Sequence, residues 1–186
     1  MNELTNKILD FWFNEIEQNN WFVSSDKIDD AVKSNFEKEL ELISDSKIQF
    51  MLVNNRSCLA YILLTDQFSR NIYRGHPTSF SYDIFARNAS QLCLDQGFIE
   101  NYNADERLFA LLPLVHSEKI EDHEVVNKLR EKWLSAHPMH DQIKKSFDDH
   151  AYAIKNFGRY PHRNIILKRE STQTEIEFLE KPDSSW

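Results

Sequence analysis

The chain has 186 residues, 41% of them hydrophobic, so it can bury a substantial core, and we expect a single domain over residues 1–186. Its three glycines are too few and too far apart to form a glycine-rich phosphate loop, which excludes the common nucleotide-binding motifs. A net charge of -8 opposes binding to nucleic acid or to an anionic membrane surface, and the apolar runs are too short for a membrane span.

Apolar residues spaced three or four apart predict helices along the first half of the chain. We expect them over residues 4–17, 26–44, 50–73 and 79–96. The third of these, the central helix, begins as a nearly continuous apolar stretch, so its early part should be buried on most sides. Gly75 and Gly97 follow two of the segments and are expected to end them.

The second half continues the same pattern, with helices expected over residues 104–120, 122–135 and 138–157. Gly158 should end the last of these, and Thr172 with Glu175 forms a capping-box pattern ahead of a short final helix. No segment alternates in the way a strand does. The prediction is therefore an all-α fold, with seven or eight helices joined as antiparallel hairpins that stack side by side.

Asp66 and Arg70 lie four residues apart on the central helix, on a stripe begun by the apolar residues Leu59 and Ile62. This position predicts an ion pair that is at least partly buried, because a buried charge needs a partner. Two interpretations stay open. The pair is a structural link between helices, or Arg70 and the nearby Arg74 face a ligand.

A second group of polar residues runs from Arg107 to Glu118. If the helix continues to residue 120, Arg107 and Glu118 share one stripe while His116 lies elsewhere. Because residues two apart point to different sides of a helix, His116 and Glu118 are not expected to converge with His123 on a metal ion. His116 is then either a packed histidine bonded to backbone or a general acid or base.

The third segment is a loop expected over residues 159–171. From Lys155 to Arg169 there are five Lys or Arg residues and no acidic one, which in an acidic chain predicts an anion site that includes Arg159, His162 and Arg163. The structural alternative is that these arginines tie the loop to acidic residues. We expect the loop to close over the central helix and to form one pocket with residues 66–74, with His116 or Glu118 at its edge.

The remaining features of the sequence argue against several other sites. Cys58 and Cys93 are isolated thiols without C-x-x-C spacing, so neither a redox motif nor a thiolate metal site is expected. We expect no metal and no cofactor. The acidic residues Glu3 and Asp10 stand where a secretory signal would be basic or apolar, which favours a cytoplasmic location.

Several multi-residue motifs occur in order along nearly the whole chain. They are Phe11-Trp12-Phe13, Leu63-Leu64-Thr65-Asp66-Gln67-Phe68-Ser69-Arg70-Asn71, Arg74-Gly75, Glu106-Arg107, Pro113-Leu114, His116-Ser117-Glu118, Gly158-Arg159-Tyr160-Pro161-His162-Arg163-Asn164 and Ser171-Thr172. In these motifs the chain resembles a bacterial family of uncharacterised proteins, the domain of unknown function 924 family. The resemblance implies a tetratricopeptide-like, right-handed helical array.

This chain departs from the family pattern at Thr65, Ser69 and Lys168, where leucine, proline and glycine are expected. The departures affect packing or loop shape and leave the charged positions intact. The family has no established reaction or ligand, so the resemblance implies a fold without implying an activity.

The sequence favours a helical scaffold that binds an anionic small molecule or a peptide carboxylate in a groove lined by Arg and His. The expected ligand-binding residues are Asp66, Arg70, Arg74, Arg107, Arg159 and Arg163. The alternative is a small enzyme acting on an anionic substrate, with His116 or His162 as general acid or base and Glu118 as a further candidate. A third interpretation makes the polar set a buried structural network. The sequence leaves the oligomeric state open.

Overall fold

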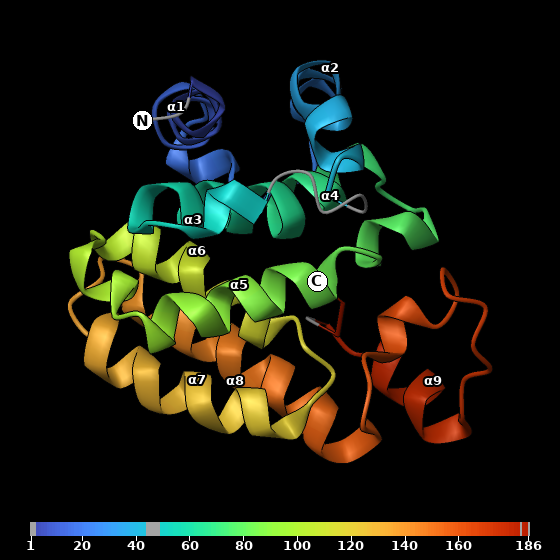
Figure 1. Cartoon of the computed structure of the whole chain (residues 1–186). Coiled ribbons are helices and arrows are strands. Elements are labelled where there is room, and N and C mark those ends of the chain that lie inside the picture. The colour runs from blue at the N-terminus through green and yellow to red at the C-terminus, as the bar shows by residue number, and fades with distance from the viewer. Residues whose placement is uncertain (1–2, 44–48, 183, 186) are drawn as a thin grey trace. The chain divides into compact units, whose positions relative to one another are not determined.

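Figure 1 shows a computed structural model of the chain, which describes residues 3–43, 49–182 and 184–185. Every regular element in this part of the chain is helical, which confirms the all-α prediction. The chain divides into two compact units, which we call unit 1 (Met1–Pro113) and unit 2 (Leu114–Trp186). The expectation of a single domain, and of a tetratricopeptide-like order for the whole array, stays a prediction.

Unit 1 contains two short layers of helices on either side of a central row. In Figure 1, α3 and α4 form this row, with α1 and α2 on one side and α5 on the other. The α-helices are α1 (Glu3–Asp10), α2 (Asp26–Glu41), α3 (Asn55–Ile62), α4 (Ser69–Ile72), α5 (Asp83–Asp95) and α6 (Ala104–Val115), which runs two residues past the boundary of the unit. Short 3-10 turns span Gln18–Asn20, Gln49–Leu52, Pro77–Phe80 and Phe98–Asn101.

The core of unit 1 is aromatic, as the thirteen phenylalanines of the sequence suggest. The buried ring of Phe68 lies 5.9, 5.5 and 4.8 Å from the rings of Phe11, Trp12 and Phe36, measured between centroids. Tilted and edge-to-face pairs of this kind each contribute roughly 0.5–1.5 kcal/mol beyond the area they bury. These contacts hold α2 and the start of the chain against the central row.

The central helix is interrupted where the sequence predicts one continuous helix over residues 50–73. A π-helical turn, Leu63–Phe68, joins α3 to α4, and a second one, Phe11–Glu15, follows α1. Two hydroxyl groups stabilise the turn at Leu63–Phe68. Thr65 Oγ1 donates to the Tyr61 carbonyl and Ser69 Oγ donates to the Thr65 carbonyl, both at 2.7 Å. Such turns are rare and frequently lie at functional sites.

Unit 2 consists of two long helices, a turn and a short helix. Helices α7 (Ile120–Trp133) and α8 (His140–Phe157) lie side by side in Figure 1 and form a hairpin. A 3-10 turn, Pro161–Arg163, precedes α9 (Gln173–Leu179), and the predicted capping box of Thr172 and Glu175 is present. Ala153, Ile154, Tyr160 and Phe178 form a buried cluster that fixes α9 and the turn against α8.

The helix ends confirm one prediction and correct another. Gly75, Gly97 and Gly158 all have positive φ angles, between 68° and 77°, as expected of residues that end helices. However, α6 ends at Val115 and not at residue 120. Ser117 Oγ accepts the Lys119 N–H at 3.2 Å and forms a turn before α7 begins, so Glu118 lies in a connection and not on the Arg107 stripe.

Candidate functional site: the histidine cluster of unit 2

The predicted site residues fall into both units, and each unit gathers its own set. In unit 1, Asp66 is fully buried, and Arg70 Nη1 lies 3.1 Å from its Oδ1 atom. Arg70 Nη2 lies 2.9 Å from Asp83 Oδ1, and Gln67 Nε2 donates to Asp66 Oδ2 at 2.6 Å. The predicted buried ion pair is confirmed.

Two further predicted arginines of unit 1 also contact groups of their own unit. Arg74 donates to both carboxylate oxygens of Asp29, at 2.5 and 2.8 Å, and Asn71 donates to the same carboxylate at 2.7 Å. Arg107 donates to the carbonyls of Ile99 and Glu100 at 3.2 and 3.3 Å. We call Asp29, Asp66, Arg70, Arg74 and Asp83 the aspartate–arginine network.

In unit 2, imidazole rings surround the buried side chain of Tyr160. The ring centroid of Tyr160 lies 6.3 Å from His123, 5.6 Å from His150 and 5.5 Å from His162. The guanidinium of Arg163 lies over the same ring, 4.7 Å from its centroid, and His116 lies 6.1 Å from His150. We call these residues the histidine cluster: His116, His123, His150, Tyr160, His162 and Arg163.

Two members of the cluster are bonded to backbone. Burial lowers the pKa of His123, and its Nε2–H donates to the Ser117 carbonyl at 2.8 Å. Burial, with the nearby His116, holds the pKa of His150 well below its ordinary value, and His150 Nδ1 lies 2.7 Å from the Ser146 carbonyl. The Tyr160 hydroxyl donates to the Val115 carbonyl. These bonds fix the rings that face Tyr160.

His162 lies in a positive environment. Burial lowers its pKa to about 3, and the charges of Arg163, His116 and Arg169 act in the same direction, whereas Glu118 opposes them. Arg163 is itself buried, and its Nη2 donates to the His116 carbonyl at 2.9 Å. A negative charge beside His162 and Arg163 would therefore be favoured.

An ion pair between Glu118 and Arg169 contacts the cluster through the backbone of Tyr160. Arg169 donates to both carboxylate oxygens at 2.9 and 3.0 Å and also to the Tyr160 carbonyl at 3.0 Å. Glu118 accepts the Tyr160 N–H at 2.8 Å. Burial disfavours the Glu118 carboxylate, but the hydrogen bonds from Arg169 and Tyr160 outweigh it and lower its pKa. Both residues therefore position Tyr160, and with it the cluster.

Arg159 lies in the same loop as His162 and Arg163 but is not a member of the histidine cluster. It donates to the two carboxylate oxygens of Glu175 at 2.6 and 2.8 Å and to the Glu170 carbonyl at 2.8 Å. The hydrogen bond from Arg159 lowers the pKa of Glu175 to about 2. This arrangement matches the structural alternative for Arg159, because it ties the loop to the start of α9.

The structure thus brings together three predicted residues, His116, His162 and Arg163, with Glu118 beside them. Sequence reasoning missed His150 as a member. The available signal was its place on the apolar stripe of α8, between Phe147 and Ile154, where a histidine stands in line with core residues. Within the described residues, no group of three or more His, Cys, Asp or Glu side chains is arranged to hold a metal ion.

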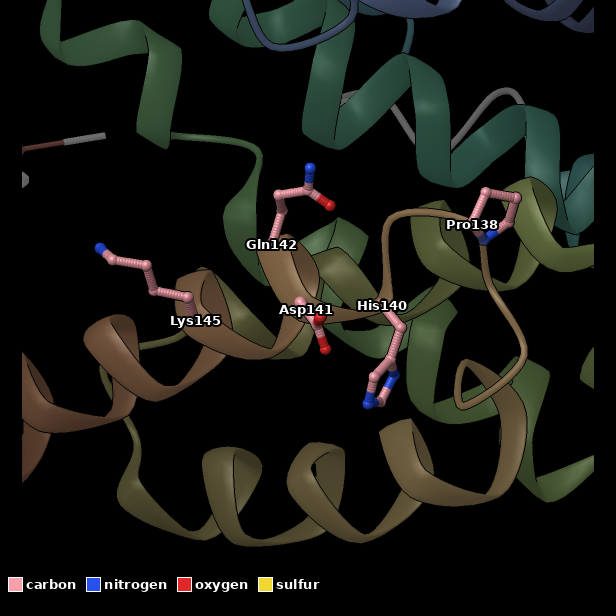
Figure 2. Close-up of a pocket in the computed structure, with 5 residues that line it drawn as sticks. All are labelled: Pro138, His140, Asp141, Gln142 and Lys145. Atoms are coloured by element: carbon pink, nitrogen blue, oxygen red, sulfur yellow. The ribbon is translucent and has the colours of Figure 1, made fainter.

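A hollow of about 520 Å³ lies elsewhere in unit 2, at the start of α8. Figure 2 shows the side chains that line it, which come from the α7–α8 connection and from the first turns of α8. They are Pro138, His140, Asp141, Gln142 and Lys145. His140 Nδ1 lies 3.1 Å from the Leu134 carbonyl, and Lys145 pairs with Asp149 at 2.8 Å. None of these residues belongs to the histidine cluster.

The model of a bacterial protein family of unknown function, DUF924, matches residues 8–183. The chain belongs to this family. It is also similar to a solved structure of a protein of unknown function from Agrobacterium tumefaciens, with 29% sequence identity and a TM-score of 0.86 over 95% of this chain and 97% of that one.

A comparison with curated proteins gives no match. Membership of DUF924 confirms the resemblance that the sequence motifs indicate. Within the described residues, none of the helices combines the length and the apolar character that crossing a membrane requires. Both the family and the solved structure are described as being of unknown function, so only the site itself indicates what the protein does.

Proposed function

We propose that this DUF924 protein is a helical scaffold that binds an anionic small molecule or a peptide carboxylate at the histidine cluster. The observation that supports the proposal is that His162 and Arg163 lie on the ring of one buried tyrosine, with His116 beside a third ring of the cluster, that of His150. Guanidinium and imidazole N–H groups are donors that suit carboxylate and phosphate oxygens.

The electrostatics of the cluster support an anion and not a cation as the ligand. Burial is the main cause that lowers the pKa of His162, and the charges of Arg163, His116 and Arg169 lower it further, whereas that of Glu118 raises it. A unit negative charge about 4 Å from a guanidinium gains on the order of 4 kcal/mol at an effective dielectric constant of about 20.

The arginines that hold the loop differ from Arg163 in what they contact. Arg159 and Arg169 each donate to both oxygens of one carboxylate, from Glu175 and Glu118. Arg163 faces an aromatic ring and a backbone carbonyl, next to the imidazole rings. We assign the loop-holding role to Arg159 and Arg169 from these carboxylate contacts. We assign ligand binding to Arg163 with His116 and His162 because these guanidinium and imidazole donors belong to one cluster.

The test is a thermal-unfolding titration with sulfate and, separately, with N-acetylglycine as a mimic of a peptide C-terminus. Saturation about 100-fold above the Kd should raise the Tm by about 5 to 10 °C. Arg163→Gln should lose most of this rise, because it removes the guanidinium charge. Lys145→Gln, which removes one charge at the exposed start of α8, should keep it. If neither anion raises the Tm of the wild-type protein, the proposal is wrong.

The alternative function is a small enzyme in which the imidazole of His162 acts as a general base. A base works best when its pKa is near the working pH, and burial lowers that of His162 to about 3. Binding is therefore the better supported function of the two. Hydrolysis of p-nitrophenyl phosphate or acetate by the wild type, lost in His162→Gln, would reverse this order.

A further inference from the structure

We propose that a second hollow of unit 2, between α8 and α9, binds a small quaternary ammonium cation of the choline type on aromatic rings. This site is separate from the histidine cluster and does not depend on the proposed function. The side chains that line the hollow are Tyr152, Asn156, Phe157, Thr174, Glu177, Phe178 and Lys181.

Three aromatic rings in this lining contact one another. The centroid of Phe178 lies 6.1 Å from that of Tyr152 and 5.1 Å from that of Phe157. Phe178 is buried in the cluster that fixes α9 against α8, whereas Tyr152 is 51% exposed. The hollow therefore combines a rigidly held ring with one that solvent reaches. Aromatic faces attract a cation within about 6 Å of the ring centroid, and this contact is how proteins recognise quaternary ammonium groups.

The α9 residues of the lining share one helical face, because they stand three or four residues apart. They are Thr174, Glu177, Phe178 and Lys181. Lys181 follows the helix, and its backbone N–H donates to the Phe178 carbonyl at 3.1 Å, which continues the turn. On α8, the Asn156 side chain donates to the Tyr152 carbonyl one turn earlier, at 2.7 Å. Helical spacing thus brings the Glu177 carboxylate to the same hollow as the rings.

The two charged side chains of the lining act in opposite directions. The Glu177 carboxylate accepts a hydrogen bond from the amide of Gln173 at 3.2 Å, and a neutral amide leaves its negative charge in place. Lys181 opposes a cation, but its exposed ammonium is carried on a flexible stem and can turn toward water. Because the two formal charges cancel, the rings decide which ligand is preferred. Ring faces prefer a cation to a neutral group of the same shape.

The size and openness of the hollow set the expected affinity. Its volume is about 330 Å³, near the lower end of the roughly 300–1,000 Å³ that ligand pockets span. A trimethylammonium group with a short substituent suits this space. Since Tyr152 and Glu177 are exposed, a bound cation stays partly hydrated, and we expect a Kd of about 1 to 10 mM for choline.

The experiment is an NMR titration of the wild-type protein with choline, followed by the aromatic signals of Tyr152, Phe157 and Phe178. A parallel titration uses the neutral analogue in which a tert-butyl group replaces the trimethylammonium group. Because the two ligands have nearly the same shape, the difference reports the positive charge. Choline should bind about 5- to 30-fold more tightly, the combined effect of two or three ring contacts. Equal affinities, or no shift of these signals up to about 100 mM choline, tenfold above the weakest expected Kd, overturn the proposal.

Variants then locate the cation. Tyr152→Leu keeps an apolar side chain but removes the accessible ring, and should raise the Kd for choline about two- to fivefold. Phe157→Leu should do the same and serves if the first variant fails to fold. Glu177→Gln should weaken binding and Lys181→Gln should strengthen it, each by about two- to threefold. The matched control is Phe22→Leu, which removes an exposed ring of unit 1 and should leave the Kd unchanged. An unchanged Kd in both Tyr152→Leu and Phe157→Leu overturns the proposal.

A quaternary ammonium group occurs both in free small molecules and in lipid headgroups, and we assign the free form. The exposed polar side chains Asn156, Thr174 and Lys181 share the hollow, whereas a surface that inserts into a bilayer is apolar. The protein should therefore stay in solution when phosphatidylcholine vesicles are sedimented. Cosedimentation that choline reverses would contradict the free ligand. None of these measurements involves sulfate, so failure here is distinguishable from failure of the proposed function.

Discussion

The two units contain similar polar residues but balance their charges in opposite ways. In unit 1, Arg70 and Arg74 contact the carboxylates of Asp29, Asp66 and Asp83, so acids outnumber the arginines of the aspartate–arginine network. In unit 2, three imidazoles and Arg163 gather on Tyr160, and a fourth imidazole, that of His116, lies beside His150. The Glu118–Arg169 pair contacts Tyr160 through its backbone.

This difference distinguishes the arginines that stabilise the fold from those that are candidates for ligand binding. An arginine that meets carboxylates in fixed geometry contributes to packing, and breaking the pair leaves a buried charge. An arginine that adds to a group of imidazoles makes the site more positive, and a negative ligand relieves it. The predictions below test this contrast, beginning with the largest effect.

Asp66→Ala should destabilise the protein by about 3 to 5 kcal/mol, because it leaves Arg70 beside an emptied, buried position. The measurement is the free energy of unfolding in urea. Asp149→Ala is the matched control, since Asp149 pairs with Lys145 on the exposed surface of α8, and it should cost about 0 to 1 kcal/mol. Equal losses for the two variants would show that the network of unit 1 does not stabilise the fold as described.

Glu118→Ala should destabilise the protein by about 1.5 to 3 kcal/mol, because Arg169 and the Tyr160 N–H lose a charged acceptor. It should also weaken sulfate binding, since Tyr160 carries the cluster. Glu177→Ala removes an exposed carboxylate of α9 that accepts from Gln173, and its effect should stay within about 0.5 kcal/mol. Unchanged sulfate affinity in Glu118→Ala would argue against its positioning role.

Lys168→Gly should stabilise the protein by about 0.5 to 1 kcal/mol. Lys168 has a φ of 54°, the left-handed conformation that favours glycine, which is the residue that the resemblance leads us to expect at this position. Lys168→Ala is the control, because alanine keeps the Cβ atom and should bring no gain. Chemical denaturation that finds both variants equally stable would show that the backbone at this position carries no strain.

The fold could be predicted from the sequence because each helix repeats its apolar residues at a fixed spacing, and Gly75, Gly97 and Gly158 end segments that the spacing defines. The Asp66–Arg70 pair was predictable for the same reason, since both residues lie on one helical stripe. The π-helical turn within the central helix was not, because nothing in the residue spacing indicates the extra residue.

The site was only partly predictable. His116, His162 and Arg163 stand in polar motifs and could be named, whereas His150 lies within an apolar stripe and resembles a core residue. The rings converge through contacts among α7, α8 and the loop before α9, and no local rule relates such distant positions. The expectation that residues 66–74 and the loop over residues 159–171 form one pocket stays a prediction.

The most direct test of the account is nitrogen NMR of the histidine side chains during a sulfate titration. The chain has seven histidines, which separate into cluster members and the others, His76, His137 and His140. Sulfate bound at the histidine cluster should shift the imidazole signals of His116 and His162 progressively to saturation, while those of His76 and His140 stay in place. Equal shifts of all seven, or shifts that spare His162, would contradict it.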